Sequence, residues 1–305
     1  MNSQKRQEAF AYYRAQKGVL DWNPLMDYAS KVLACRDRIE KQVQDVSFSK
    51  ESAEQAIQSA KPYLQLCSLR IDSERFISDC IQLVESFIDS EIIHDEQISE
   101  ILAIDWNKLR SETIEKVGED PNAFFDDAVL DLAGSSVTET QEVVLAGILI
   151  NVVRAYLNPV GLKMTNLLSH EERDLFRKAP FLCPTCGGPA SLAQVTNQEN
   201  SFNHTRKLFC ACCGTTWDYE KERCGLCGEF DGQKLDYIYT EEDPRHRLHL
   251  CSRCHGVLPT VFQDAISTPF DFDIEQNASS IIESVWLEHQ LMKSSQKIID
   301  IPTEK

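Results

Sequence analysis

The chain has 305 residues, a formal net charge of −17 at pH 7 and 42% apolar residues. This length exceeds that of one typical domain, and the apolar content suffices for a folded core, which excludes a wholly disordered or collagen-like chain. Because 48 acidic residues outnumber 31 basic ones, non-specific attraction to nucleic acid or to an anionic membrane surface is not expected.

The first 178 residues have a helical pattern, with few glycines and with apolar residues three or four positions apart. The pattern is present over Leu25–Ile39 and Ala56–Cys67. Further helices are predicted over roughly 74–89, 92–116, 121–133, 139–157 and 170–177. Pro159 is expected to end the helix at 139–157. About seven such helices predict a bundle, with the apolar segment 143–157 as its central member.

The most apolar segment, Val143–Leu157, is shorter than a bilayer requires and contains Asn151 and Arg154. It therefore predicts a buried helix rather than a membrane span. The N-terminus has basic residues but no apolar stretch after them, so it does not have the pattern of a secretory signal. We therefore expect a cytoplasmic protein, in a reducing compartment where clustered cysteines bind metal more often than they form disulfides.

At Pro180 the composition changes, because glycine, cysteine and aromatic residues replace the helical pattern. The alternation over Leu235–Tyr239 is typical of a short strand. After about Phe262, a turn-rich segment leads to a last helical pattern over roughly Ile274–Lys293 and a polar tail. These observations predict an α+β chain in three parts: a helical bundle (1–178), a duplicated metal-binding domain with short antiparallel strands (179–263), and a C-terminal helix with a tail (264–305).

Twelve cysteines occur in the chain, and nine of them lie between Cys183 and Cys254. Eight form CxxC pairs: Cys183/Cys186, Cys210/Cys213, Cys224/Cys227 and Cys251/Cys254. The first two pairs are separated from the last two by 41 positions, so the region is a duplication of the unit CxxC, 23 residues, CxxC. Each CxxC turn, or knuckle, points two sulfurs at one place, and two knuckles provide the four thiolates of a tetrahedral metal site.

The spacing therefore predicts two metal centres, formed by consecutive knuckles: Cys183, Cys186, Cys210 and Cys213 in the first, and Cys224, Cys227, Cys251 and Cys254 in the second. A cross-brace of alternating knuckles uses the same residues and stays open as the alternative. We favour consecutive pairing because each unit contains its own predicted strands. Four cysteines leave no open coordination position, so hydrolytic metal chemistry is not expected.

The metal stays open between zinc and iron, since both accept four thiolates. The segment Cys183–Gly187 resembles a rubredoxin knuckle, which is consistent with a one-electron iron site. Cys212 is expected to be a spare thiol, and the first three cysteines are expected in the apolar core: Cys35, Cys67 and Cys80. The nearby histidines are not expected to be ligands: His204, His246, His249 and His255. We assign no catalytic residue, because the sequence has no phosphate loop, dinucleotide fingerprint or nucleophile elbow.

The four knuckles resemble the motifs of the formate dehydrogenase accessory protein family, FdhE. The segments that carry the resemblance are CPTCGGP from Cys183, LFCACCGTTW from Leu208, RCGLCG from Arg223 and CSRCHG from Cys251. Their order and spacing agree with the family, as does Trp217, seven positions before Cys224. The sequence departs from the family pattern at Val257–Pro259 and at Cys212, whereas the eight predicted ligands agree.

The resemblance implies a helical N-terminal region, a rubredoxin-like or zinc-ribbon metal domain and a short helical C-terminus. It implies a cytoplasmic accessory protein or chaperone that binds the catalytic subunit of a molybdenum or tungsten formate dehydrogenase during its maturation, and that is not itself an enzyme. The alternative is a rubredoxin-like iron protein that transfers electrons. A nucleic-acid-binding zinc ribbon is the weakest interpretation, because residues 181–260 hold 8 basic and 10 acidic residues. The sequence predicts neither the oligomeric state nor the surface that binds a partner.

Overall fold

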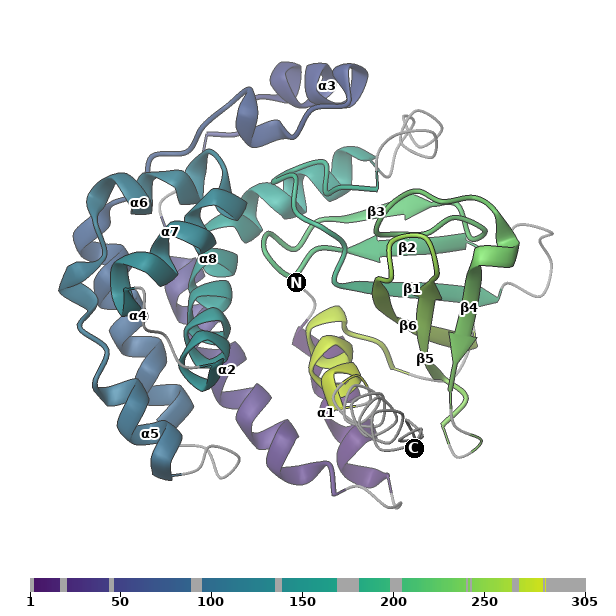
Figure 1. Ribbon diagram of the computed structural model, residues 1–305, viewed down its shortest axis with the longest axis horizontal. Helices are drawn as coiled ribbons and strands as arrows, with labels where there is room; N and C mark the ends of the chain where they lie inside the picture. Colours follow the sequence, from purple (N-terminus) through teal and green to yellow (C-terminus); the bar gives the residue numbers. More distant parts are fainter. Residues whose placement is uncertain are drawn as a thin grey trace, which may run out of the picture.

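The structure, a computed structural model, describes residues 3–16, 21–43, 47–88, 95–134, 139–168, 181–197, 205–239, 241, 243–264, 269–281 and 283. Figure 1 shows a helical part beside a β-sheet, with the first helix and a C-terminal helix between them. The labelled helices are α1 (Ser3–Ala15), α2 (Asn23–Gln42), α3 (Lys50–Ser59), α4 (Ser73–Ile88), α5 (Asp95–Leu102), α6 (Ser111–Glu115), α7 (Pro121–Ala133) and α8 (Glu139–Leu168). Residues 272–281 form the C-terminal helix. The α+β fold class predicted from the sequence is confirmed.

Helix α8 is the central member of the helical part, as predicted, and it packs on α2, α4, α5 and α7. The segment Gln141–Leu168 is long and apolar enough to cross a membrane by length and composition alone, yet 67% of its most apolar window is buried within the fold. A helix surrounded by other helices of the same chain needs no lipid to cover its apolar side chains. The burial of α8 is therefore consistent with the predicted core helix.

The prediction that Pro159 ends this helix is wrong, because α8 continues through Pro159 to Leu168. A proline inside a helix removes one backbone hydrogen bond and crowds the preceding turn. Tertiary contacts hold the extension in place, since Met164 and Leu168 are buried. The hydroxyl of Thr165 also accepts the backbone N–H of Thr216 at 2.9 Å. Packing against the sheet therefore outweighs the local effect of the proline.

Two other helical segments differ from the prediction. The single helix predicted over 92–116 is divided into α5, a 3₁₀ turn at Trp106–Lys108 and α6. The carboxylate of Asp105 accepts the N–H of Asn107 at 3.2 Å, which caps the turn that buries Trp106. The pattern over Ala56–Cys67 is also divided, because Ala60 adopts a left-handed conformation with φ of 53° at the end of α3. The helix predicted at 170–177 lies outside the described residues.

The metal-binding region forms one six-stranded sheet in the order β3-β2-β1-β6-β5-β4. Its strands are β1 (Leu192–Asn197), β2 (Thr205–Phe209), β3 (Thr216–Tyr219), β4 (Leu235–Ile238), β5 (His246–Cys251) and β6 (Val257–Asp264). A shift of 41 positions places β1, β2 and β3 on β4, β5 and β6, so each predicted unit is a three-stranded repeat. Strands are antiparallel within each repeat, as predicted, whereas β1 and β6 pair in parallel, with Ala193 opposite Thr260. Both repeats therefore run in the same direction.

The apolar core continues from the helices into the first repeat. Val153 and Leu157 of α8 belong to the same buried cluster as Cys213 and Trp217. A second buried cluster joins α1, α2 and the C-terminal helix: Ala9, Tyr13, Trp22, Leu25, Met26, Leu33, Ile274 and Ala278. The helical bundle and the repeats therefore share one hydrophobic interior. The predicted division after residue 178 lies among residues outside the described part of the chain, and both domain boundaries stay predictions.

Three arginines from three helices surround Asp273 at the start of the C-terminal helix. Arg36 of α2 pairs with both carboxylate oxygens, while Arg6 of α1 and Arg154 of α8 lie 3.5 and 3.6 Å from them. Burial raises the pKa of Asp273, but the charges of Arg36, Arg154 and Arg6 outweigh burial and hold it well below its usual range. Arg154 also donates to the carbonyl of Cys210 at 2.8 Å. This cluster ties the helices to the second knuckle.

The buried His246 of β5 makes a second link, to α1 and to the C-terminal helix. The Nδ1 atom of His246 lies 2.7 Å from Asp243, while its Nε2 atom lies 3.0 Å from Glu275 and 2.8 Å from the hydroxyl of Tyr13. Burial lowers the pKa of His246, but hydrogen bonds to Asp243 and Glu275 outweigh it, so that the pKa lies above 6.5. Arg245 also pairs with Glu275, on the same side of the cluster.

We expect this histidine to make stability fall at alkaline pH. Since the folded state binds the proton of His246 more tightly than the unfolded chain does, its contribution is complete below pH of about 6.5 and is lost as pH rises through the raised folded pKa. The His246→Gln variant is expected to lose this pH dependence. Urea unfolding between about pH 6 and about pH 9 measures it. An exposed-site control, His255→Gln, should keep the wild-type slope, and an unchanged slope in His246→Gln would contradict the assignment.

Candidate metal centres

The structure gathers the eight predicted ligands into two groups of four, and it selects consecutive knuckles rather than the cross-brace. The first group is Cys183, Cys186, Cys210 and Cys213, and the second is Cys224, Cys227, Cys251 and Cys254. Within each group all four Sγ atoms lie within 4.8 Å of one another. The predicted grouping of the eight cysteines into two clusters of four is therefore confirmed, and metal binding at these clusters stays a prediction.

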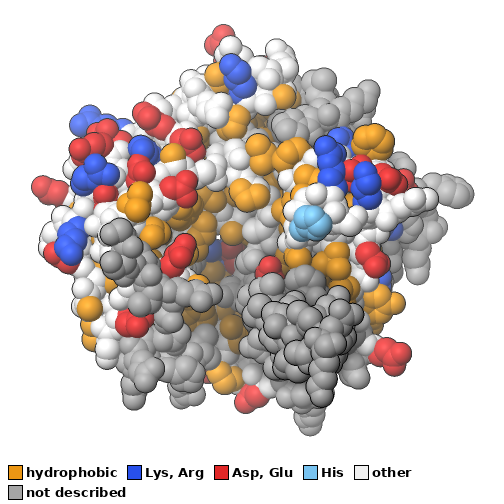
Figure 2. Space-filling view, viewed as in Figure 1, with side chains coloured by type: hydrophobic (Ala, Val, Ile, Leu, Met, Phe, Trp, Pro, Cys, Tyr) orange, Lys and Arg blue, Asp and Glu red, His pale blue; other side chains and the backbone are white. Residues whose placement is uncertain are grey.

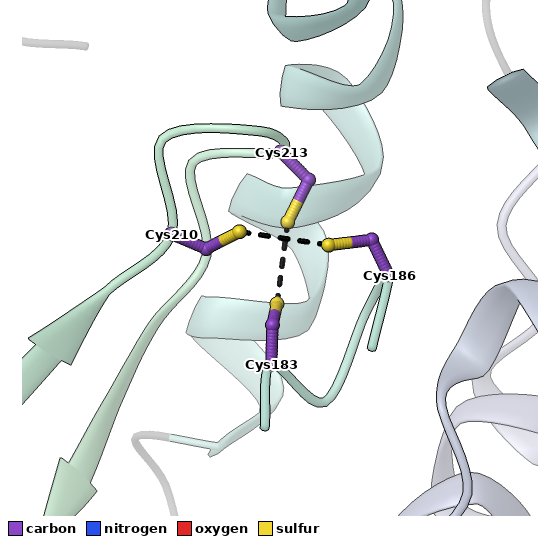
Figure 3. A group of neighbouring side chains, drawn as sticks. All are labelled: Cys183, Cys186, Cys210 and Cys213. Atoms are coloured by element: carbon purple, nitrogen blue, oxygen red, sulfur yellow. Dashed lines mark hydrogen bonds between the residues drawn. The ribbon is translucent and has the colours of Figure 1, made fainter. Parts of the chain in front are cut away.

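The sulfur spacing in both groups fits a tetrahedral metal ion. In the first centre Sγ of Cys183 lies 3.4 Å from that of Cys213, and Sγ of Cys186 lies 3.5 Å from that of Cys210 (Figure 3). The corresponding distances in the second centre are 3.9 and 3.7 Å, at residues 41 positions later. A tetrahedron with metal–sulfur bonds of about 2.3 Å has sulfur–sulfur edges of about 3.8 Å. Both groups can therefore hold an ion with little movement of their side chains.

All four knuckles use the same backbone turn, which points the two sulfurs at one place. The N–H of the first cysteine donates to the carbonyl five residues later, at 2.7 to 3.1 Å across the four knuckles. The fifth residue of each turn has positive φ: Gly187 (76°), Gly214 (76°), Gly228 (74°) and His255 (57°). Three knuckles therefore carry glycine where an L side chain is strained, and the fourth carries histidine.

Replacing His255 with glycine is expected to stabilise the fourth knuckle. A non-glycine residue in the left-handed region costs about 1–2 kcal/mol, and the greater flexibility of glycine in the unfolded chain offsets part of the gain. We expect an increase in the free energy of unfolding of about 0.5–1 kcal/mol, measured by urea unfolding. The matched opposite change, Gly214→Ala, should destabilise strongly, because its Cβ would lie 2.3 Å from the guanidinium carbon of Arg154. A destabilised His255→Gly protein would contradict this account.

The first centre is enclosed between the helices and the sheet. Its four cysteines are buried. The short helix η1 (Tyr63–Gln65) covers the first knuckle, because the N–H groups of Tyr63 and Leu64 donate to the carbonyls of Pro184 and Thr185 at 2.9 and 3.0 Å. The buried hydroxyls of Thr185 and Thr215 lie 2.6 Å apart and join the two knuckles.

Helix α8 covers the second knuckle of the first centre from the other side, and Figure 3 shows it passing behind the four sulfurs. Arg154, Gly161 and Thr165 lie on one face of α8, at spacings of seven and four residues. A Cβ at Gly161 would lie only 2.0 Å from the carbonyl oxygen of Cys213, so the two backbones are in direct contact. The first centre therefore contributes to the joint between helices and sheet.

The second centre lies at the surface of the molecule. Cys254 is exposed and Cys227 is half-buried, whereas Cys224 and Cys251 are buried. Phe230, which follows Cys227 by three positions in the sequence, is 75% exposed. Solvent and other molecules can therefore reach this centre, whereas the first centre is covered by the chain itself.

Burial favours the neutral form of two ligand thiols, so a metal ion must displace their protons when it binds. Burial raises the pKa of the Cys183 thiol well above its usual range, and it raises that of Cys224 to about 12. Without a cation, both groups would therefore stay protonated at neutral pH. A metal ion supplies the positive charge that stabilises thiolates, and binding then releases protons. The donor set fits zinc or iron, and the geometry does not distinguish them.

The other cysteines, and the histidines that the structure describes, lie outside the two groups. Cys35 and Cys80 are buried in the helical core, and Cys67 is half-buried against it. Cys212 is buried in the second knuckle but belongs to neither group, as predicted. His246 and His249 are buried and hydrogen-bonded to other side chains, and His255 is exposed: none of them joins a group. His204 lies outside the described residues.

Two arginines that border the centres were not predicted from the sequence. Arg154 was noted there only because a charged residue disfavours a membrane span, yet its guanidinium binds the carbonyl of Cys210. Arg206 was not singled out at all, although its side chain is fully buried beside the third knuckle. One signal was available for Arg206, because Arg247 occupies the same position in the second repeat.

Comparison with known proteins gave both sequence and structural relatives, while no family model matches the chain. It is 25% identical over 138 residues to a "Protein FdhE homolog" of Aquifex aeolicus, covering 45% of this chain and 46% of the relative. It is 32% identical over 87 residues to one of Stutzerimonas stutzeri, covering 28% of each. These matches span less than half the length of either relative.

The fold is similar to the crystal structure of the FdhE protein from Pseudomonas aeruginosa. The TM-score is 0.55 at 14% sequence identity, and the match covers 94% of this chain and 90% of the other. A likeness at this identity shows a shared fold, and its coverage extends beyond the metal-binding region to the helical part. This chain is therefore similar to several FdhE homologs in sequence over part of its length, and to an FdhE protein in fold over most of its length.

Proposed function

We propose that this protein is a cytoplasmic accessory protein of formate dehydrogenase, which assists maturation of the enzyme and does not itself oxidise formate. The observation that carries the proposal is the pair of preformed four-cysteine clusters in a chain that is similar to FdhE homologs. Four sulfur ligands leave no open coordination position on a bound ion, which argues against use of either centre to activate substrate or water.

The metal ions are proposed to bind at the eight cysteines, with a different role for each centre. The first centre is buried in the joint between helices and sheet, so its ion would act as a structural cross-link. The second centre is exposed at Cys254, and the exposed Phe230 follows its ligand Cys227 by three positions in the sequence. It is therefore the centre that a partner protein can touch, and we propose that the catalytic subunit of formate dehydrogenase binds there.

A direct binding measurement tests this function. The purified catalytic subunit of a molybdenum or tungsten formate dehydrogenase is titrated into the metal-loaded protein by calorimetry. We expect binding by the wild type, and at least tenfold weaker binding by Cys227→Ser and by Phe230→Ala, since exposed aromatic anchors carry much of the energy of an interface. The matched control Cys67→Ser alters a half-buried cysteine in the helical core and should bind as the wild type does.

Two results would contradict the proposal. Absence of binding by the wild type would contradict the accessory function, and equal binding by all variants would show that the second centre is not part of the interface.

Nucleic acid is not proposed as a partner. On the face shown in Figure 2, basic and acidic side chains are interspersed over the helical part instead of forming a basic stripe.

Electron transfer by iron is the second candidate, and the exposure of the second centre favours it. An electron can reach an ion held by Cys254 and Cys227 without passing through the core. Protein prepared without oxygen would then contain iron and show thiolate-to-iron absorption bands that bleach on reduction. Two zinc ions and no visible bands would exclude this function and leave a structural role.

A further inference from the structure

The second centre borders on a buried guanidinium that comes from the first repeat. Arg206 of β2 is fully buried. Its Nη1 donates to the carbonyl of Arg223 at 2.8 Å, and its Nη2 lies 3.0 Å from Nδ1 of His249. A Cβ at Gly225 would lie 3.4 Å from the same Nη2. The guanidinium therefore reaches the backbone on both sides of the ligand Cys224.

Among the described residues, no carboxylate pairs with this charge. Burial removes the charge of Arg206 from solvent and thereby lowers its pKa. His249 does not supply a negative charge either. A guanidinium has no hydrogen-bond acceptor, so it donates to Nδ1 of His249, which accepts as a neutral ring nitrogen. A buried cation without a counter-ion is strongly unfavourable.

The other cations beside the second centre already have carboxylate partners. Arg223 pairs with Glu220 at 3.6 Å, and Arg253 pairs with Glu229 at 3.5 Å. Both are also partly exposed to solvent, which screens their charge. Arg206 differs in being buried and without such a partner.

A loaded centre provides the missing negative charge. Four thiolates around a divalent ion carry a net charge of about −2, and around a trivalent ion about −1. We infer that Arg206 is the counter-cation of the second centre: it neutralises part of the charge of the metal–thiolate group across the border between the repeats. This inference rests on the proposed metal binding, and it makes Arg206 a positioning residue for that centre.

The first centre shows the contrast. Its bordering arginine, Arg154, binds the carbonyl of Cys210 but also lies 3.6 Å from Asp273. Arg154 therefore has a carboxylate partner, shared with other arginines, whether or not an ion is bound, whereas Arg206 would gain a negative partner only from a loaded second centre. Loss of the Arg206 charge should consequently stabilise the metal-free protein and weaken metal binding. If Arg206 only packed against its neighbours, its replacement would instead lower both the stability of the metal-free protein and the affinity for the metal.

In the experiment, cobalt(II) is added to the full-length, metal-free protein in the presence of a competing chelator of known affinity. The thiolate-to-cobalt absorption bands report how much cobalt the protein binds. We expect Arg206→Gln to weaken the second bound ion by about 10–100-fold and to leave the first ion unchanged. The metal-free variant should unfold at a higher urea concentration than the metal-free wild type. Arg206→Lys keeps the charge and is expected to retain most of the affinity. The matched control is Arg247→Gln at the equivalent repeat position, where Arg247 lies over the rings of Phe262 and Tyr239, and it should bind both ions normally.

The outcomes separate two claims: that both centres bind metal, and that Arg206 balances the charge of the second centre. A wild type that binds fewer than two cobalt ions overturns the proposed centres and this inference together. Two ions in the wild type, with an unweakened second ion in Arg206→Gln, overturn the inference alone. An equal loss in Arg206→Lys and Arg206→Gln also overturns it, because shape and not charge would then matter. If Arg206→Gln does not fold, NMR of the wild type replaces it: exchange of the Arg206 guanidinium protons is expected to slow on loading, and unchanged exchange overturns the inference.

Discussion

Replacing Cys186 with serine is expected to destabilise the whole molecule, whereas replacing Cys227 should remove one ion at a much smaller cost. Binding of a structural zinc ion contributes about 10–16 kcal/mol to the folding of small zinc-finger peptides. The first centre contacts both η1 and α8. We therefore expect Cys186→Ser to lower the free energy of unfolding by about 5 kcal/mol or more, which is comparable to the total stability of many proteins. Cys227→Ser should leave the helical part and the first centre folded.

Elemental analysis combined with urea unfolding, followed by circular dichroism, measures both effects. Cys67→Ser serves as the control because Cys67 belongs to neither group. A chelator should also remove the two ions at different rates, the ion at exposed Cys254 first. Equal destabilisation by Cys186→Ser and Cys227→Ser, or simultaneous release of both ions, would contradict the assigned difference between the centres.

The second large effect is expected at Asp273. The Asp273→Asn variant keeps the shape of the side chain but leaves the buried Arg36 and Arg154 without their carboxylate. Breaking a buried ion pair by removing one partner costs about 3–5 kcal/mol. Since Arg154 also binds the carbonyl of Cys210, we expect the variant to weaken the attachment of the helices to the first centre as well.

Urea unfolding and limited proteolysis test this prediction. The matched control is Asp37→Asn, which removes a carboxylate that pairs with Arg6 at 2.7 Å but is 41% exposed. An exposed pair contributes about 0.2–1 kcal/mol, so the control should change stability little. Equal effects of the two substitutions would mean that the Asp273 cluster adds no more than a surface ion pair.

The cysteine pattern could be interpreted from the sequence because a knuckle is local. Four residues and the turn around them fix the direction of two sulfurs, and the 41-residue period identifies which knuckles share a unit. The helical texture of the N-terminal part was equally local. Consecutive pairing required a further step, the argument that each unit closes its own strands, and the antiparallel pairs β1–β2 and β4–β5 agree with it.

The parts that the sequence could not predict depend on contacts between distant segments. Pro159 is a helix breaker by local rules, and only the packing of Thr165 and its neighbours on the sheet keeps α8 intact. The clustering of Arg6 and Arg36 with Asp273 joins residues more than 200 positions apart. The parallel pairing of β1 with β6, and with it the placement of Arg206 beside the other repeat, likewise follows from the assembled sheet.

The parallel junction of β1 and β6 also determines how the duplicated sheet ends. Units that succeed one another by simple translation have no closed symmetry, so they leave two unlike ends at which further units could add. At one end α8 covers the edge strand β3, since the hydroxyl of Thr165 accepts a hydrogen bond from the backbone N–H of Thr216. The other end is β4, which has only four residues and an exposed Asp236, features that discourage the addition of another strand. One covered and one short, charged end would limit the array to two units and oppose its growth into a fibre.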